Sequence, residues 1–359
     1  MAPVVEKCLE LFRFERDALS LSLEERRVVG EKATIVREKG FDRNELAKKA
    51  PISFLDEALV VVFLTCIMTG PLIMGPSFVF CAYFYGLKGV ISWIFAFTVL
   101  ATHPLPTKAK EEAWRCRLTR ALYRYFSYRV VWSGNAKEAC CTTKRAWIGA
   151  GPPHGVVPIA NVLSIPAMNS FARPLVGGVA SVSEYTPFLR YLCLFGTCDV
   201  SAASIAKCID EDLCVGTVPD GIAGIFAYDE DDEIVILKSR KGIAKLALRT
   251  GAPILPAYSV GNTQVYTAVF DNFGICEHIS RKIKASIFFF YGRFGLAIPR
   301  RVNITMLVGD PILVGPDKIP DPTPQQIDEL HDKLLKSLEN LFNQHKASLG
   351  WHHKRIVFK

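Results

Sequence analysis

The sequence predicts an α/β fold, a mixed sheet flanked by helices, with an N-terminal transmembrane helical hairpin. Two observations predict it. Between residues 145 and 320, short apolar runs that end in glycine or proline alternate with helical stretches, which is typical of an α/β domain. Before them, residues 58–87 and 89–107 contain no Asp, Glu, Lys or Arg, enough for about two membrane spans of roughly 20 residues each.

The pattern divides the chain into four segments. Basic side chains flank the second segment, the predicted membrane hairpin. Lys48 and Lys49 precede it, and Lys108 and Lys110 follow it. Because basic residues tend to stay in the cytosol, both termini are expected there. The segments are a polar, partly helical N-terminal region (1–54), a membrane hairpin (55–107), an amphipathic interfacial helix (108–130) and a cytosolic-face domain (131–359).

The position of the hairpin turn stays open. Pro71 and Pro76 each follow a glycine and can break a helix, but a turn there leaves Lys88 inside the second span, which is costly. A turn at residues 86–89 avoids this cost and shortens the second span. The alternative is a buried core hairpin of a soluble protein, although uncharged runs of this length are rare in soluble folds.

The helix expected after the hairpin is amphipathic. From Trp114 to Phe126, apolar side chains recur at helical spacing while most arginines lie off that stripe. Directly after a membrane span, this pattern predicts a helix that lies in the membrane interface. The alternative is an ordinary surface helix whose stripe packs into the protein core.

The fourth and longest segment is the α/β domain. A helix is predicted from Gly242 to Thr250, closed by Gly251. The last helix has Thr323 as its N-cap, followed by proline and a glutamine in the capping-box position. We expect its histidines, His331 and His345, to be structural. Buried strands are predicted at residues 146–151, 214–219, 253–261 and 302–310.

Composition narrows the classes of function. The mean hydropathy is +0.22, and the net charge of +8 comes from clusters around the apolar stretch. This favours contact with anionic lipid or a phosphorylated substrate, and we find no nucleic-acid recognition motif. The eleven cysteines are scattered without a Cys-x-x-Cys pair, so neither a metal site nor a disulfide framework is expected.

His154 is the first candidate for chemistry, within GAGPPHGVVP at residues 149–158. It follows a predicted strand, Pro153 before it stiffens the chain, and Gly155 after it allows close approach to the backbone. A stiff, open loop suits a general base, which must be held within hydrogen-bond reach of the proton it removes. From these residues alone, a loop histidine without function is an equal alternative.

Four blocks resemble, in the same order, motifs of the type-2 diacylglycerol acyltransferase family, which includes monoacylglycerol and wax-alcohol acyltransferases. GPPHGVVPIA (151–160) resembles the His-Pro-His-Gly signature. The resemblance covers roughly residues 55–350 and implies a glycerolipid acyltransferase-like fold. The later blocks are LKSRKGIAKLALRTGAPILPAYSVGNTQVY (237–266), YGRFGLAIPRRVNITMLVGDPI (291–312) and PTPQQIDELHDKLLKSLENLFNQHK (322–346).

The resemblance implies an acyl-CoA:diacylglycerol O-acyltransferase that makes triacylglycerol at the endoplasmic reticulum membrane and the lipid-droplet surface. Its partners would be acyl-CoA, diacylglycerol and membrane lipids, without a cofactor, and self-association into a homo-oligomer stays open. The alternatives are the same chemistry on monoacylglycerol, a wax alcohol or phytol, and a non-catalytic hairpin scaffold. The family's second histidine corresponds to His154, and Pro152 replaces the first, which leaves one candidate base.

Direct acyl transfer is the predicted mechanism. A thioester is already activated, so His154, neutral at cytosolic pH, can take the proton of the acceptor hydroxyl as its oxygen attacks the carbonyl. The alternative is a nucleophile activated by His154, such as Ser164 or Cys193, although no nucleophile-elbow sequence accompanies either.

The carboxylate expected to orient His154 departs from the family pattern. VPDGIAGIF (218–226) resembles the family's Pro-Gly-Gly-x-x-Glu, with Gly224 at the glutamate and an extra acid at Asp220. Asp220 either replaces that carboxylate or is a turn residue before Gly221. The acidic run from Asp229 to Glu233 is expected to be a solvated loop.

The phosphates of CoA require positive charge and N–H donors. Lys238, Arg240 and Lys241 precede Gly242 at the start of a predicted helix, whose dipole adds to the attraction. Arg293 is a second candidate contact. The alternative is a solvated basic helix start.

Overall fold

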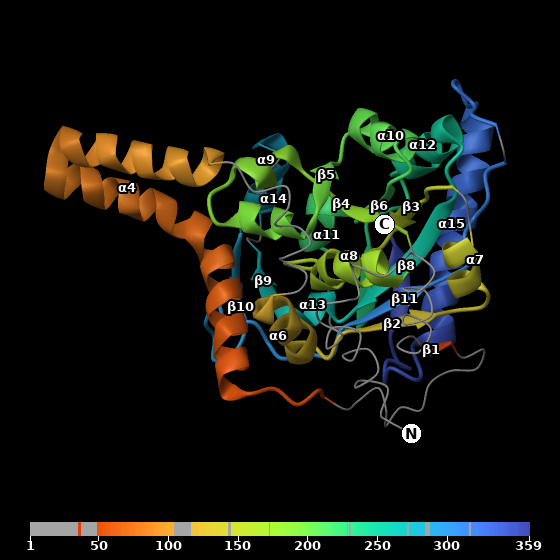
Figure 1. The fold of residues 1–359 in the computed structure, drawn as a ribbon, viewed down its shortest axis with the longest axis horizontal. Coiled ribbons are helices and arrows are strands. Elements are labelled where there is room, and N and C mark those ends of the chain that lie inside the picture. The colour runs from red at the N-terminus through yellow and green to blue at the C-terminus, as the bar shows by residue number, and fades with distance from the viewer. Residues whose placement is uncertain are drawn as a thin grey trace.

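An eight-stranded mixed sheet runs through the molecule with helices on both faces (Figure 1). The expected α/β class is therefore confirmed. The computed structural model describes residues 35–36, 49–103, 116–142, 145–171, 173–227, 229, 231–270, 273–283, 288–315 and 317–359. Most of the expected N-terminal region, and residues 108–115 of the expected interfacial helix, lie outside these ranges.

The strands lie in the order β1-β2-β11-β8-β3-β6-β4-β5. Neighbours are parallel except β11 and β8, which are antiparallel. All four strands expected from the sequence are confirmed, as β3, β6, β8 and β11. The bounds are Ile35–Val36 (β1), Arg129–Trp132 (β2), Ile148–Ala150 (β3), Leu175–Val179 (β4), Thr197–Asp199 (β5), Cys214–Thr217 (β6), Ile254–Val260 (β8) and Thr305–Val308 (β11).

Each face of the sheet has its own apolar core. On β2, Val130 and Trp132 belong to one cluster, with side chains of α6 and α8, and Val131 belongs to the other, with side chains of α12 and α15. A strand buried on both faces is therefore apolar at successive positions. The helices are α6 (Arg117–Tyr125), α7 (Ala136–Thr142), α8 (Ile159–Phe171), α9 (Ser181–Tyr185), α10 (Ala202–Asp210), α12 (Gly242–Thr250) and α15 (Pro324–His345), with a 3₁₀ helix, η1 (Leu189–Phe195).

The predicted helix ends are confirmed. Gly251 closes α12 in the left-handed conformation, with φ of 68°. Thr323 and Gln326 form the capping box of α15. His331 and His345 of α15 are buried, and His345 Nε2 lies 3.2 Å from Ser133 Oγ, in keeping with structural roles.

A small parallel ribbon corrects one expectation. β7 (Asp232–Val235) pairs with the C-terminal strand β12 (Arg355–Phe358), so the end of the acidic run is not a solvated loop. Glu233 is only 3% exposed; Lys354 Nζ lies 3.1 Å from its Oε1, and the Tyr258 hydroxyl donates to its Oε2 at 3.2 Å. Burial raises the pKa of this carboxyl, and Lys354 opposes that rise.

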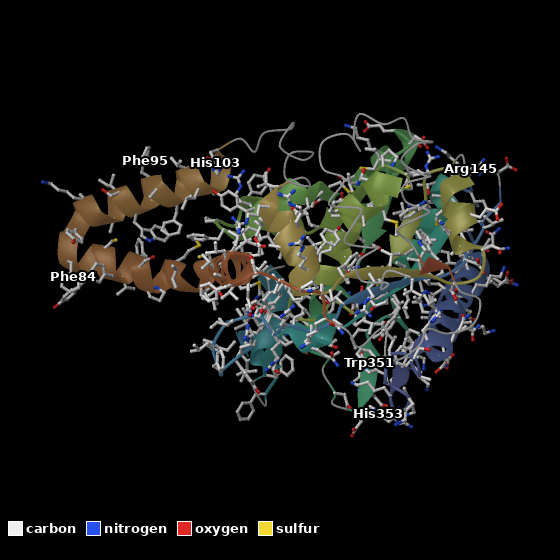
Figure 2. The ribbon with its side chains drawn as sticks, turned by 60° about the horizontal axis from the view of Figure 1, so that its bottom comes forward. Phe84, Phe95, His103, Arg145, Trp351 and His353 are labelled. Carbon is white, nitrogen blue, oxygen red and sulfur yellow. The ribbon has the colours of Figure 1, made fainter. Side chains whose placement is uncertain are left out.

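The apolar segment forms one long helix, α4 (Phe54–Thr102), that is interrupted at Gly86, where φ is 55° and ψ is −142°. The segments on either side lie next to each other (Figures 1 and 2). Trp93 Nε1 donates to Ser77 Oγ at 2.9 Å, and the Trp93 and Phe78 ring centroids are 5.2 Å apart. Length and composition make α4 a candidate span.

The base of α4 is fixed to the α/β domain. Arg190 of η1 donates to the carbonyls of Leu100 and His103, both at 2.9 Å. The Phe188 ring occupies the space where a side chain at Gly70 would lie. Between these contacts, residues 71–99 project from the domain (Figure 2), and we call them the apolar arm.

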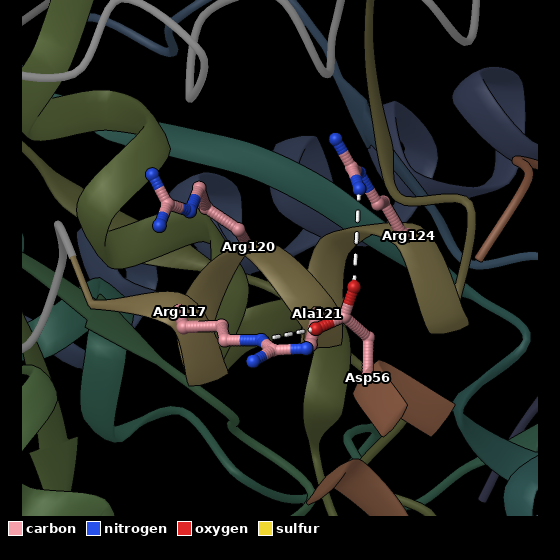
Figure 3. Close-up of a pocket in the computed structure, with 5 residues that line it drawn as sticks. All are labelled: Asp56, Arg117, Arg120, Ala121 and Arg124. Atoms are coloured by element: carbon pink, nitrogen blue, oxygen red, sulfur yellow. Dashed lines mark hydrogen bonds and ion pairs between the residues drawn. The ribbon is translucent and has the colours of Figure 1, made fainter. Parts of the chain in front are cut away.

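Helix α6 packs its apolar stripe into the protein. Ala121, Leu122 and Tyr125 are buried in the core. This agrees with the alternative expectation, a surface helix whose apolar stripe packs into the protein core. The arginines face a cleft beside the first turn of α4, lined by Asp56, Arg117, Arg120, Ala121 and Arg124 (Figure 3). Arg117 Nε lies 2.6 Å from Asp56 Oδ1, which fixes α6 to α4.

Candidate active site

Three loops meet at one edge of the sheet. Strands β3, β6 and β8 are adjacent and parallel, so their carboxyl ends share an edge, where α/β proteins place their ligands. His154 follows β3, and Asp220 follows β6 as the N-cap of α11 (Gly221–Ile225). Asn262 follows β8 and opens α13 (Asn262–Val265).

The imidazole of His154 is half-buried and oriented by its own loop. Its Nδ1 lies 2.7 Å from the carbonyl oxygen of Gly155. A carbonyl oxygen can only accept a hydrogen bond, so Nδ1 carries the proton in the neutral ring and Nε2 retains its lone pair. This tautomer has the acceptor nitrogen that a general base requires.

The side-chain amides of two asparagines hold the His154 loop in place. Asn262 Nδ2 donates to the carbonyl of Pro153 at 3.0 Å, and its Oδ1 accepts from the backbone N–H of Ala160 at 2.8 Å. Asn161 Nδ2 donates to the carbonyl of Gly151 at 2.8 Å. Sequence reasoning assigned no role to these amides, and their signal was weak, since an asparagine after an apolar run usually indicates a turn.

Gly155 is required by the close approach of the start of α13. Its φ is +61°, and a Cβ added there would lie 2.7 Å from the carbonyl oxygen of Asn262. On the other side of the loop, the backbone N–H of Ser259 donates to the carbonyl of Pro152 at 2.7 Å. The loop is therefore held at both ends by β8 and the residues after it.

Asp220 contacts the histidine loop rather than its own helix. Its side chain does not cap α11; its Oδ2 accepts from the backbone N–H of His154 at 3.0 Å. Asp220 is fully buried, and burial raises its pKa, opposed by the nearby His154 and Arg240. Its Oδ1 has no hydrogen-bond partner among the described residues.

The basic candidates separate into two regions. Arg240 Nη1 lies 3.5 Å from the carbonyl of Pro219, against the turn that carries Asp220. Lys241 is paired with Asp328 of α15 at 2.6 Å, while Lys238 and Gly242 are exposed at the start of α12. Arg293 lies against α4, with its Nη1 2.6 Å from Glu57 Oε1.

The alternative nucleophiles have other contacts. The hydroxyl of Ser164 donates to the carbonyl of Asn161 at 2.7 Å, so it is engaged with its own helix. Cys193 is buried in η1. Among the described residues, no group of three His, Cys, Asp or Glu side chains could hold a metal ion.

A second cleft lies on the far side of α11. It runs between α11, β7 and α14 (Ile275–Ile283). Five of its eight lining residues are apolar, and the other three are charged residues of α14 and the C-terminus. It is lined by Ala223, Phe226, Ala227, Ile234, Ile236, Glu277, Arg281 and Lys359.

Residues 78–359 match the family model described as diacylglycerol acyltransferase. The chain belongs to the diacylglycerol acyltransferase family. Diacylglycerol O-acyltransferase 2 of Dictyostelium discoideum is 29% identical over 323 residues, covering 81% of this chain and 92% of that protein. The human protein of the same name is 29% identical over 248 residues, covering 63% of this chain and 62% of its own length. This diacylglycerol acyltransferase family member is thus an acyl-CoA-dependent acyltransferase.

Among solved structures, the 1-acyl-sn-glycerophosphate acyltransferase of Thermotoga maritima is similar. The match covers 80% of this chain and 97% of that one, with 12% sequence identity and a TM-score of 0.37.

Two departures of this chain from the diacylglycerol acyltransferase pattern lie in contact. A Cβ added at Gly224 would lie 2.0 Å from Asp220 Oδ2 and 2.4 Å from its Cγ. Any side chain at 224 therefore excludes the observed position of the Asp220 carboxylate. The residues at 220 and 224 are therefore sterically linked across a single turn of helix.

Proposed function

We propose that this chain transfers the acyl group of acyl-CoA to the free hydroxyl of diacylglycerol, giving triacylglycerol, with His154 as the general base. The observation that carries the proposal is the Nδ1 contact of His154 with the Gly155 carbonyl at 2.7 Å. It directs the lone pair of Nε2 away from the loop backbone. Family membership supplies the thioester substrate and makes diacylglycerol the expected acceptor.

The proposed step conserves atoms and protons. Nε2 of His154 removes the proton of the acceptor hydroxyl while its oxygen forms a bond to the thioester carbonyl carbon. The carbon–sulfur bond then breaks, and the imidazolium returns the proton to the leaving thiolate. The products are triacylglycerol and free CoA, and no covalent acyl-enzyme forms.

Asp220 is the proposed carboxylate partner, acting through the backbone. Its hydrogen bond from the His154 N–H fixes the backbone position from which the imidazole projects. Its negative charge favours the imidazolium that forms during transfer. Pro153 and Gly155 support the loop. We place the CoA phosphates at the start of α12, where Lys238 and Gly242 are exposed and Arg240 lies towards the Asp220 turn.

The apolar arm is the proposed membrane anchor. Its two segments leave and re-enter the domain on the same side (Figure 1), which supports a transmembrane hairpin with both termini in the cytosol. The endoplasmic reticulum membrane is the proposed location, with access to lipid droplets. Family membership and the long apolar helix are consistent with a membrane protein.

The test is transfer from labelled acyl-CoA in membranes of cells unable to make triacylglycerol. Diacylglycerol, monoacylglycerol, a wax alcohol and phytol are supplied separately, so the labelled product identifies the acceptor. His154→Ala should abolish product while expression and membrane insertion are unchanged. Retained turnover in that variant would exclude His154 as the base, and no product from the wild type would favour the non-catalytic scaffold.

A further inference from the structure

A ribbon of two strands presents aromatic side chains on its outer face. β9 (Thr267–Val269) and β10 (Phe289–Tyr291) are antiparallel, with Phe289 opposite Val269. Phe288 is buried and Phe290 half-buried on the inner face, near Phe226 and Tyr266. Phe289 is 73% exposed, and Val269 beside it is exposed as well. The ribbon is thus apolar on both faces, and within the part of the chain that the structure describes its inner face is the one packed against protein.

Helix α14 and the loop after β10 extend this apolar surface. Phe273, just before α14, is 86% exposed, and Ile279 on α14 is exposed. Glu277 and Arg281 of the same helix line the cleft towards α11. In the loop, Phe294 is 82% exposed and Leu296 is exposed. Isolated exposed apolar side chains are common, but a group on adjacent elements indicates a binding surface.

The surface is continuous with the base of α4. Thr65 Oγ1 of α4 donates to the carbonyl of Ala297 at 3.2 Å, and Arg293 pairs with Glu57. The first segment of α4 lies beside β10, on the side from which the apolar arm projects (Figure 1). An arm inserted in a bilayer would therefore bring this surface to the level of the headgroups.

Arginine side chains lie beside the aromatic rings of this surface, and one of them, Arg293, is paired with Glu57. The guanidinium of Arg293 lies 5.5 Å from the centre of the Phe294 ring, and that of Arg300 lies 5.4 Å from the Tyr291 ring. The arginine face of α6 lies across the first turn of α4 (Figure 3). Aromatic side chains mixed with arginines match the boundary between acyl chains and anionic headgroups.

We propose that this surface, which we call the ribbon platform, binds the phospholipid bilayer at the headgroup–acyl boundary, as a second membrane contact besides the arm. The inference rests on the proposed membrane placement of α4. The platform would hold the cleft between α11 and α14 next to the lipid, so that an apolar acceptor leaves the bilayer beside α11, the helix that follows Asp220. The platform comprises Val269, Phe273, Ile279, Phe289, Phe294 and Leu296.

Photo-crosslinking of the full chain tests the platform. p-Benzoylphenylalanine is introduced singly at Phe289, Phe273, Phe84 and Leu313, all exposed, so that none of the substitutions disturbs the core. Each protein is reconstituted in vesicles of phosphatidylcholine and phosphatidylserine, irradiated and analysed for lipid adducts. Phe84 reports on the arm. Leu313 is the control, because it is 77% exposed and follows Ile312, which pairs with the amino end of β8, opposite the His154 loop.

Lipid adducts at Phe289 and Phe273, without adducts at Leu313, are the expected result. Adducts at Phe84 alone would overturn the platform and leave the arm as the anchor. Adducts to protein instead of lipid at Phe289 would also overturn it, since the surface would then be a protein interface. Adducts at Phe289 and Phe273 without any at Phe84 would support the platform while rejecting insertion of the arm.

Discussion

The contact between Asp220 and residue 224 gives the sharpest prediction. Gly224→Ala places a Cβ 2.0 Å from the Asp220 carboxylate oxygen, whereas ordinary contact begins near 3.4 Å. The carboxylate must then move by about 1.4 Å, the difference between these distances. That displacement breaks the 3.0 Å hydrogen bond to the His154 N–H.

Two costs follow from that displacement. Overpacking costs about 1–3 kcal/mol, and the loss of a hydrogen bond to a charged acceptor costs about 1.5–3 kcal/mol. A misplacement of about 1 Å near a reacting group lowers turnover by roughly 100-fold. We therefore expect Gly224→Ala to be destabilised by about 3–5 kcal/mol, with turnover down by about two orders of magnitude.

The reciprocal exchange separates this reasoning from simple damage. Asp220→Gly combined with Gly224→Glu converts PDGIAG to PGGIAE, the family pattern, and removes the side chain that clashes. We expect each single change to lose activity and the double variant to recover most of it, in acyl transfer from labelled acyl-CoA alongside thermal unfolding. Gly75→Ala is the control, because a Cβ there has no neighbour within 4 Å. A fully active Gly224→Ala, or a folded double variant as inactive as the single ones, would refute the steric link.

Three further predictions follow from buried contacts. Lys354→Ala should lower the free energy of unfolding by about 3–5 kcal/mol, because it leaves the Glu233 carboxylate buried without its cation. Denaturant unfolding measures this free energy. Adding Glu233→Gln to the same chain should restore most of the lost stability. Gly155→Ala should abolish acyl transfer, since its Cβ would lie 2.7 Å from the Asn262 carbonyl oxygen at a φ of +61°. Wild-type turnover in this variant would contradict the requirement for glycine at this position. Asp220→Asn keeps an acceptor for the His154 N–H and removes a group whose pKa is raised in the folded state. A raised carboxyl pKa stabilises the fold at low pH and loses that contribution as pH rises through the folded pKa. The stability of the variant over wild type should therefore grow as pH rises above the ordinary carboxyl range, while turnover falls. Unchanged turnover would show that the charge of Asp220 is not used.

Local signals predicted the elements that the sequence alone can specify. β3, β6, β8 and β11 were predicted because strands buried on both faces are runs of apolar residues. Helix α15 was predicted because its capping box lies within four residues of sequence. The relation of Asp220 to Gly224 was not predictable, since it depends on which way the carboxylate turns once β3 and β6 are adjacent.

Other features depend on residues far away in the sequence. Glu233 was expected to be solvated because its neighbours are acidic, while its burial depends on Lys354 at the C-terminus. Residues 288–291 are all aromatic in sequence, which does not distinguish the two faces of β10. The fold shows that Phe289 is exposed while Phe288 is buried. For the His154 loop, the sequence predicted its position and stiffness, while the asparagine amides that hold it come from two other segments.

The interruption at Gly86 determines where one charge comes to lie. Gly86 is sixteen residues beyond Gly70, about 24 Å at 1.5 Å per residue, against a hydrocarbon thickness of about 30 Å. In the proposed placement, the exposed Lys88 next to the tip reaches the opposite headgroups of a bilayer with its extended side chain. A lipid droplet has a single phospholipid layer around oil, so the same ammonium group would be stranded there at a cost of about 2.5–3.5 kcal/mol. In this proposed placement, one lysine would favour partitioning of the whole chain into the bilayer over the droplet by roughly 100-fold.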